Sequence, residues 1–215
     1  MHNSKVILDG LESLPQVFSS EDAVAVLRHY YQAPLKVLEA LERRAVLVRL
    51  RRGCYAFARS FDPLLAANLV YSPSYISFET ALMLYGLIPE RTELILSVVD
   101  GRPREIQTSD GDYSYISQSR ALFALGMDLQ INPNQVLAIA NREKALLDTL
   151  ARANLRTVSA HPAEILAYVI DGLRIEESAL EKLSLRKLRR MAPLYRNLAP
   201  RKLVAALSER GKAHE

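Results

Sequence analysis

The stretch Val46–Ala58, VLVRLRRGCYAFA, decides the fold because it indicates two short strands on either side of a glycine. Valine, leucine, tyrosine and phenylalanine favour strands, and Gly53 accepts the positive φ that a tight hairpin loop requires. Side chains alternate along a strand, which predicts one face made by Val46, Val48 and Leu50 and an opposite face made by Leu47, Arg49 and Arg51. Three arginines on so short a hairpin indicate an anionic partner.

Three helical segments are predicted ahead of this hairpin. The first covers Lys5–Leu14, and Ser19 begins the second by forming a capping box with Asp22. Pro34 suits the first turn of the third helix, because an amide hydrogen there has no helical partner. Helical periodicity predicts buried positions at Ala23, Val26, Leu27, Tyr30, Leu35, Leu38 and Leu41. Three helices followed by a two-stranded hairpin, within residues 1–60, are typical of a winged helix-turn-helix domain.

A winged helix-turn-helix domain holds double-stranded DNA with its third helix in the major groove and its hairpin along the backbone. We therefore assign Gln32 and Lys36 to the groove, where amide and ammonium groups read base edges. The other predicted DNA-binding residues are directed at phosphates or the minor groove: Arg43, Arg44, Arg49, Arg51 and Arg52. If about six phosphates are neutralised, the logarithm of affinity falls with the logarithm of salt concentration at a slope of about −5.

Two points about this module stay open in the sequence. A winged helix can serve in protein contact alone, without binding DNA. A monomer of this size covers little DNA, so we expect a homodimer on inverted repeats in the protein's own promoter, as is common for such regulators. No dimer interface is evident from the residues themselves.

Composition indicates an ordinary globular protein, with 49% hydrophobic and 24% charged residues among 215. No run of 18 apolar residues indicates a membrane span, and no signal peptide is recognisable at the start. The single cysteine, Cys54, favours a reducing, cytoplasmic location. Net charge is +3 over residues 1–60, −5 over residues 61–172 and +6 over residues 173–215. A polyanion is therefore expected to meet the two ends of the chain.

The rest of the chain predicts an α+β protein with two further parts. Residues 61–172 are expected to form an α/β domain, with helices over 63–70, 78–85, 142–153 and 162–172, strands over 93–100 and 135–140, and a hairpin around Asp110-Gly111. Residues 173–215 are expected to form two or three short basic helices, broken at Pro193 and Pro200. No internal repeat is present.

Three motifs follow one another in the sequence: LRRGCYAFA (50–58), PSYISFETALMLYGLIPE (73–90) and NREKALLDTL (141–150). Over about residues 15–155 the chain resembles the AbiEi-like family, which comprises antitoxins of type IV toxin–antitoxin systems, also described as regulators of viral defence. The family often has Pro-Glu-Lys-Ala-Leu-Leu-Asp where this chain has REKALLD at 142–148. The resemblance implies a DNA-binding winged helix, an α/β antitoxin domain and repression of the protein's own operon. It also implies a nucleotidyltransferase toxin as functional partner, without a stable complex being required.

Neither a catalytic residue, nor a metal site, nor a cofactor is predicted. The histidines do not occur with cysteine or acidic residues at metal-ligand spacing. The strongest enzyme alternative is a Mg²⁺-dependent nuclease that would use Glu79, Asp100 and Glu105. Lys144 and Asp148 are four residues apart on one helical face, where an ordinary ion pair worth a few tenths of a kcal/mol is expected.

The basic C-terminal segment admits three interpretations. Its cations cluster on one short predicted helix, at Arg186, Lys187, Arg189 and Arg190. They could form a solvated helix face, a second phosphate-contacting patch, or a surface for a toxin or tRNA. We expect a non-enzymatic DNA-binding repressor that acts as an antitoxin. The alternative is a stand-alone regulator whose second domain senses a ligand or forms oligomers.

Overall fold

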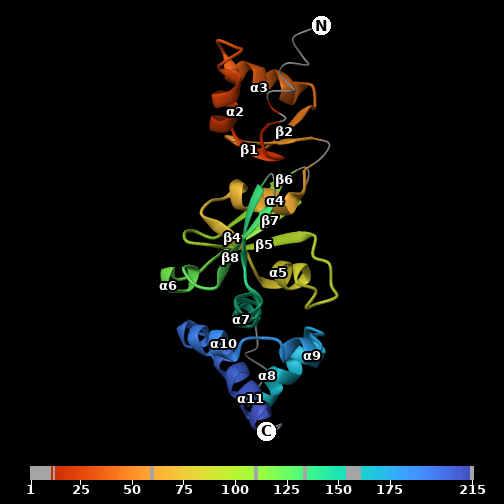
Figure 1. The fold of residues 1–215 in the computed structure, drawn as a ribbon, viewed down its shortest axis with the longest axis vertical. Helices are drawn as coiled ribbons and strands as arrows, with labels where there is room; N and C mark the ends of the chain where they lie inside the picture. Colours follow the sequence, from red (N-terminus) through yellow and green to blue (C-terminus); the bar gives the residue numbers. More distant parts are fainter. Residues whose placement is uncertain are drawn as a thin grey trace.

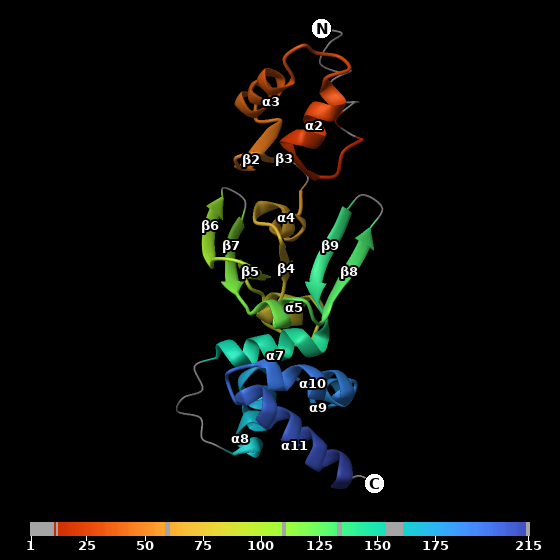
Figure 2. The same ribbon diagram turned by 90° about the vertical axis from the view of Figure 1, so that its left-hand side faces the viewer.

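The computed structural model describes residues 11, 13–58, 61–108, 111–132, 135–153 and 161–213, and it is a mixed α+β fold with two sheets. Three layers follow one another along the longest axis (Figure 1). The N-terminal helices and a small sheet lie at one end, a six-stranded sheet lies in the middle, and the C-terminal helices lie at the other end (Figure 2).

The N-terminal unit packs two helices on a three-stranded antiparallel sheet. Its elements are β1 (Val17–Ser19), α2 (Ser20–Leu27), α3 (Pro34–Arg43), β2 (Leu47–Arg51) and β3 (Cys54–Phe57). β3 lies between β1 and β2. The capping box is confirmed, because the amide of Asp22 donates to Ser19 Oγ at 3.1 Å and the Asp22 carboxylate accepts from the Ser19 amide. The predicted hairpin is confirmed as well, with Gly53 at a φ of +79°. The first predicted helix, over residues 5–14, lies almost wholly outside the described residues.

Two apolar side chains of this unit are exposed against expectation. Tyr30 and Leu35 keep 56% and 57% of their surface, so the predicted burial is wrong at both positions. Tyr30 lies three residues beyond Leu27, the last residue of α2, so helical periodicity no longer applies to it, and Leu35 lies in the first turn of α3. Burial is confirmed at Ala23, Leu27, Leu38 and Leu41.

Both faces of the small sheet are covered. Leu47 packs with Tyr55 and the helices in one apolar cluster, whereas Leu50 and Cys54 belong to the large core beyond the sheet. Leu47 and Arg49 share one face, as predicted, and it is the face that carries Tyr55 and the helices. A β-bulge between Arg49 and Arg51 interrupts the alternation of side chains along β2. The alternation that holds from Leu47 to Arg49 therefore does not continue to Arg51.

The middle layer is a sheet in the order β6-β7-β5-β4-β9-β8, in which β5 with β7 and β4 with β9 are parallel pairs. The predicted hairpin of β6 and β7 is confirmed, although Asp110 lies outside the described residues. The short strand β4 was not foreseen. The elements of this layer are α4 (Pro63–Val70), β4 (Ser74–Ile76), α5 (Phe78–Leu84), β5 (Leu94–Val99), β6 (Arg104–Thr108), β7 (Gly111–Ser117), α6 (Arg120–Phe123), β8 (Met127–Asn132), β9 (Gln135–Ala140) and α7 (Arg142–Arg152).

Helix α4 fills the space where this sheet divides into two arms (Figure 2). Its Asn68 side chain donates to the Ser74 carbonyl at 3.2 Å and accepts from the Ala138 amide at 2.8 Å, so it bridges β4 and β9. On the other arm, the hydroxyl of Tyr115 donates to the Ala67 carbonyl at 2.7 Å. These bonds satisfy backbone groups that a divided sheet and a helix end would otherwise leave unpaired.

The C-terminal layer is helical, and α8 packs against α11. Its elements are α8 (Pro162–Ala167), a π-helical turn (Tyr168–Gly172), α9 (Glu177–Leu180), α10 (Leu185–Met191), a 3₁₀ turn (Ala192–Leu194) and α11 (Ala199–Ala213). Pro193 lies in the 3₁₀ turn that follows α10, as the predicted break requires, but Pro200 lies in the first turn of α11 and so begins a helix. Within the described ranges, no helix is long and apolar enough to cross a membrane.

The hairpin and α4 are joined by Arg51. Its Nε and Nη2 donate to the Leu69 carbonyl at 3.2 and 2.8 Å, near the C-terminal end of α4, where a cation is electrostatically favoured. Cys54 lies buried on the neighbouring strand, and burial raises the pKa of its thiol to about 11, against the opposing influence of the Arg51 charge. The rate at which a reagent reaches the Cys54 thiol therefore reports on the contact between the N-terminal unit and the middle layer.

We expect Arg51→Ala to raise the rate at which a disulfide reagent modifies Cys54 by about fivefold or more, since loss of about 1 kcal/mol of hydrogen bonding makes opening more frequent. The measurement is the modification rate near neutral pH. Arg52→Ala is the matched control, because no described hydrogen bond joins the Arg52 side chain to α4. Equal rates for the two variants would contradict the assignment.

Candidate functional site

Four of the seven residues that the sequence assigns to DNA lie on α3 or directly beside its ends. Gln32, Lys36, Arg43 and Arg44 are all exposed. Leu38 and Leu41, on the opposite side of α3, are buried against the small sheet and so fix the position of the helix. The helix ends at a left-handed residue, Ala45 with a φ of 52°, after which the Val46 amide donates to the Leu41 carbonyl at 3.0 Å. This helix-ending motif sets the direction in which the chain enters β2.

The three hairpin arginines have different surroundings. Arg49 is exposed, and its guanidinium lies 6.0 Å from the centre of the Tyr55 ring, a distance at which a cation is attracted to the ring face. Arg52 is exposed at the hairpin turn. The Arg51 guanidinium, in contrast, donates hydrogen bonds to the backbone carbonyls of Leu69 and Arg52. Among the hairpin arginines, Arg51 thus holds the hairpin against α4, and Arg49 and Arg52 lie exposed at its surface.

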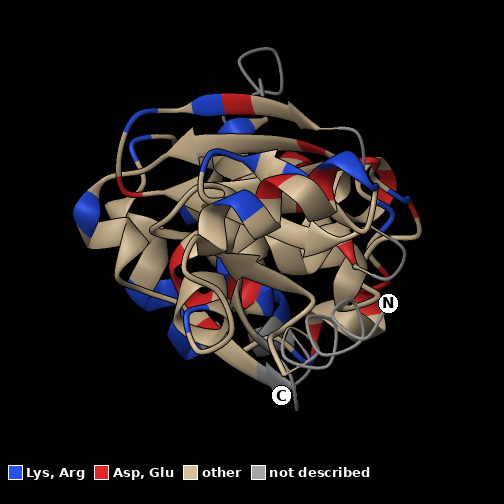
Figure 3. Ribbon diagram, turned by 90° about the horizontal axis from the view of Figure 1, so that it is seen from above, with Lys and Arg blue, Asp and Glu red and all other residues tan. Residues whose placement is uncertain are grey.

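Acidic residues accompany these cations. Glu39 is exposed on α3 between Lys36 and Arg43. Seen from the N-terminal end, blue basic and red acidic segments are interspersed over the molecule (Figure 3). Because Glu39 lies among the α3 cations, the net positive charge of this helix is reduced, and direct contacts contribute more than a long-range positive field.

The second basic group lies on α10, at the opposite end of the molecule from α3 (Figures 1 and 2). Arg186, Lys187, Arg189 and Arg190 are all exposed there. Two of them also have partners within the chain, because Lys187 Nζ lies 3.6 Å from Glu143 and Arg189 donates to Ser208 at 3.0 Å. Since the six-stranded sheet separates α10 from α3, the two basic groups form no continuous surface.

A buried polar cluster lies between the sheet and the C-terminal helices. Lys144 and Asp148 on α7 form the predicted ion pair, and both side chains are fully buried. Every residue of α7 from Glu143 to Leu150 is buried, because the helix is covered by the sheet on one side and by helices on the other. The expected few tenths of a kcal/mol do not apply to a pair without solvent.

Asp148 accepts hydrogen bonds from four side chains. Ser77 donates at 2.6 Å, Gln118 at 2.6 Å and Tyr195 at 2.5 Å, and Lys144 is the fourth donor. These donors come from the start of α5, the end of β7, α7 itself and the segment after the 3₁₀ turn. The carboxylate is thereby satisfied by residues that are distant in the sequence.

Lys144 lies in an aromatic enclosure. Its Nζ is 5.7 Å from the ring centre of Tyr75 and 5.5 Å from that of Tyr195, and it donates to Gln118 Oε1 at 2.8 Å. Burial lowers the pKa of Lys144, while Asp148 acts in the opposite direction. Burial, reinforced by the Asp148 charge, raises the pKa of the Tyr195 hydroxyl, which therefore stays a donor.

The members of this cluster other than Lys144 and Asp148 were missed from the sequence. Ser77 occupies the N-cap position of α5, but its hydroxyl makes no cap bond and donates to Asp148 instead. Gln118 and Tyr195 stand in a loop and in the basic C-terminal segment, with no local pattern to mark them. The one available signal was a lysine and an acid spaced four apart within an otherwise apolar run.

Glu79 and Asp100, two acidic residues of the nuclease alternative, lie beyond opposite ends of β4. Glu79 forms an ion pair with Arg152 at 3.2 Å. Asp100 follows Val99, which pairs with Ser74 at the start of β4, whereas Glu79 lies beyond the other end of that strand. Among the described residues, no group of three or more histidine, cysteine or acidic side chains is placed to hold a metal ion.

Comparison with known proteins identifies no family for the chain. No family model matches it. No curated protein matches it significantly. Its function is therefore inferred from the geometry of its own residues and from the motifs in its sequence.

The buried pair predicts strong coupling between its two members. Asp148→Asn and Lys144→Met should each lower the free energy of unfolding by about 3 kcal/mol, because each leaves the other charge buried without its counter-charge. The double variant should be more stable than the sum of the two changes by about 1.5 kcal/mol or more. Urea denaturation of the four proteins measures this coupling. Lys187→Met removes an exposed partner of Glu143 and should cost less than about 1 kcal/mol. Additive losses at positions 144 and 148 would refute the coupling.

Gly126 is packed directly against Lys144 and predicts a second stability effect. It has a φ of +70°, and an added Cβ would lie 2.8 Å from Lys144 Cβ and 2.9 Å from Met191 Sδ. Gly86 has a similar φ of +66° with no atom within 4 Å, so it serves as the control. Gly86→Ala should cost about 1 kcal/mol for backbone strain, and Gly126→Ala about 1–3 kcal/mol more for overpacking, as measured by urea denaturation. Equal losses would show that close packing is not the cause.

Proposed function

We propose that this protein is a DNA-binding transcriptional repressor and that its N-terminal unit is a winged helix-turn-helix domain. The observation that carries the proposal is the pairing of β1 with β3 in a sheet whose other edge is β2, with α2 and α3 packed on it. The chain order β1, α2, α3, β2, β3 then makes α3 the recognition helix and the β2–β3 hairpin the wing.

The surface of α3 supports a role in the major groove. Its inner side is anchored by Leu38 and Leu41, and its outer side exposes Lys36 and Arg43, with Gln32 just before its start. A helix of this kind fits the major groove, which is about 12 Å wide. Gln32 and Lys36 are then the groups that read base edges, and Arg43 and Arg44 are the groups that contact phosphates.

The wing supports phosphate contact through two of its arginines. Arg49 and Arg52 are exposed, while Arg51 fixes the hairpin to α4 through the Leu69 carbonyl. A wing held in this way loses less conformational freedom on binding, so its cations are pre-organised for an anion. Removing Arg49 or Arg52 therefore tests binding, and removing Arg51 tests the position of the wing.

The role within a cell is proposed from the resemblance to AbiEi-like antitoxins. On that basis the protein represses its own operon in a type IV toxin–antitoxin system and opposes a nucleotidyltransferase toxin. The proposal assigns no catalytic step to the chain. A nucleotidyltransferase gene next to the gene for this protein distinguishes an antitoxin from a stand-alone regulator.

We expect the double variant Arg49→Ala/Arg52→Ala to bind the protein's own upstream DNA about 10- to 100-fold more weakly. Loss of two phosphate contacts should also reduce the salt slope by about 2, from about −5 to about −3. Fluorescence anisotropy with labelled upstream DNA over a range of salt concentrations measures both quantities. Arg186→Ala/Arg190→Ala on α10 removes the same charge far from α3 and should leave both unchanged. Unchanged affinity and slope for the wing variant would overturn the proposed interface.

A further inference from the structure

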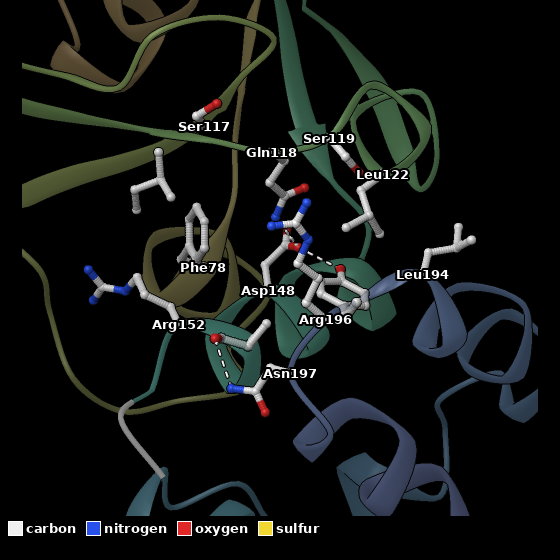
Figure 4. A pocket seen from close by; sticks show the side chains of 13 residues that line it. Phe78, Ser117, Gln118, Ser119, Leu122, Asp148, Arg152, Leu194, Arg196 and Asn197 are labelled. Carbon is white, nitrogen blue, oxygen red and sulfur yellow. Dashed lines mark hydrogen bonds between the residues drawn. The ribbon is translucent and has the colours of Figure 1, made fainter. Parts of the chain in front are cut away.

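A pocket of about 550 Å³ opens between the six-stranded sheet, α7 and the segment that follows the 3₁₀ turn (Figure 4). Its volume falls within the range of about 300–1,000 Å³ that is usual for small-molecule sites. It is lined by Phe78, Ile116, Ser117, Gln118, Leu122, Asp148, Arg152 and Arg196, among others. It shares Asp148 and Gln118 with the buried polar cluster, which forms one wall.

Two arginines give the pocket a positive character. Arg196 is exposed and forms no ion pair with the acidic residues that the structure describes. Arg152 is 44% exposed, forms an ion pair with Glu79, and lies with its guanidinium 5.7 Å from the centre of the Phe78 ring. Figure 4 shows the Arg152 side chain on the Phe78 side of the pocket and Arg196 apart from it. Guanidinium groups bind carboxylate and phosphate oxygens through paired N–H donors.

The one acidic side chain in the wall does not cancel this charge. Asp148 is paired with Lys144 and accepts from Ser77, Gln118 and Tyr195, so its negative charge is already compensated. The remaining wall combines apolar side chains with the hydroxyl groups of Ser117 and Ser119. Such a wall suits a ligand that carries an apolar body as well as an anionic group.

Phe78 adds a conformational observation at the same place. It has a φ of 56°, which a bulky residue without special support rarely adopts. The preceding Ser77 is held by Asp148, so the buried cluster supports the strained backbone directly behind the pocket. Strain of this kind is concentrated in proteins at ligand-binding sites.

We propose that this pocket binds a small organic anion, a phosphate monoester or a carboxylate attached to an apolar group. Arg196 binds the anionic group, and the side chains of Ile116, Leu122 and Leu194 contact the apolar body. Because the lining comes from both the sheet layer and the C-terminal layer, a bound anion joins the two. The site includes no residue of α3 or of the hairpin, so it does not depend on the proposed DNA binding.

The test is isothermal titration of the full chain with two anionic probes, adenosine monophosphate and salicylate. Adenosine and salicyl alcohol are the matched neutral compounds. At least one anion should bind with a stoichiometry of one and a Kd below about 1 mM, while its neutral counterpart binds at least about 10-fold more weakly. Adenosine monophosphate tests a phosphate and salicylate tests a carboxylate, so the two titrations show which anionic group the pocket binds. The absence of binding by both anions, or equal binding of the neutral compounds, overturns the proposal.

Variants locate the binding in this pocket. Arg196→Gln should weaken the anion by about 10-fold or more, whereas Arg186→Gln on α10 should leave its affinity unchanged. Circular dichroism and urea denaturation verify that both variants are folded. If Arg196→Gln binds the anion with unchanged affinity, the proposed site is refuted. The affinity of Arg196→Gln for upstream DNA is measured in parallel, so failure of the ligand site and failure of the proposed DNA interface give separate results.

Discussion

The buried carboxylate of Asp148 is the group on which the arrangement of the layers depends. It collects donors from the start of α5, from the end of β7, from α7 and from the C-terminal segment. An ion pair that has lost its water is stable only while every hydrogen-bond partner is in place. The cluster therefore specifies where α7 lies between the sheet and the C-terminal helices, whereas the apolar residues around it supply most of the stabilising burial.

A second junction connects the small sheet to α4. Leu50, Cys54 and Ala56 extend the large core into the N-terminal unit, and Arg51 binds the end of α4 from the same sheet. The unit that we propose to contact DNA is consequently held against the middle layer and does not hang on a free linker. A surface on α3 and two wing arginines is thereby presented in a fixed geometry, which favours recognition of a defined duplex shape.

The proposed DNA interface and the proposed anion pocket lie in different layers and use different chemistry. The interface consists of exposed cations beside a helix, as suits a polyanion that is larger than the protein unit itself. The pocket combines two arginines with apolar walls, as suits a small molecule. The basic residues on α10 belong to neither, and two of them are engaged with Glu143 and Ser208.

Local sequence patterns determined the elements that depend on local physics. The Ser19 capping box, the Gly53 turn and the helix that begins after Asn141 follow from backbone preferences that act over a few residues. The exposed cations of α3 were predictable in the same way. Only the tertiary structure decided which charges are free, since Arg51 and Arg52 are adjacent in sequence but only Arg51 meets the Leu69 carbonyl. It also decided that Lys144 and Asp148 are buried and that Gln118 and Tyr195 join them, because contacts between distant segments depend on how whole layers pack.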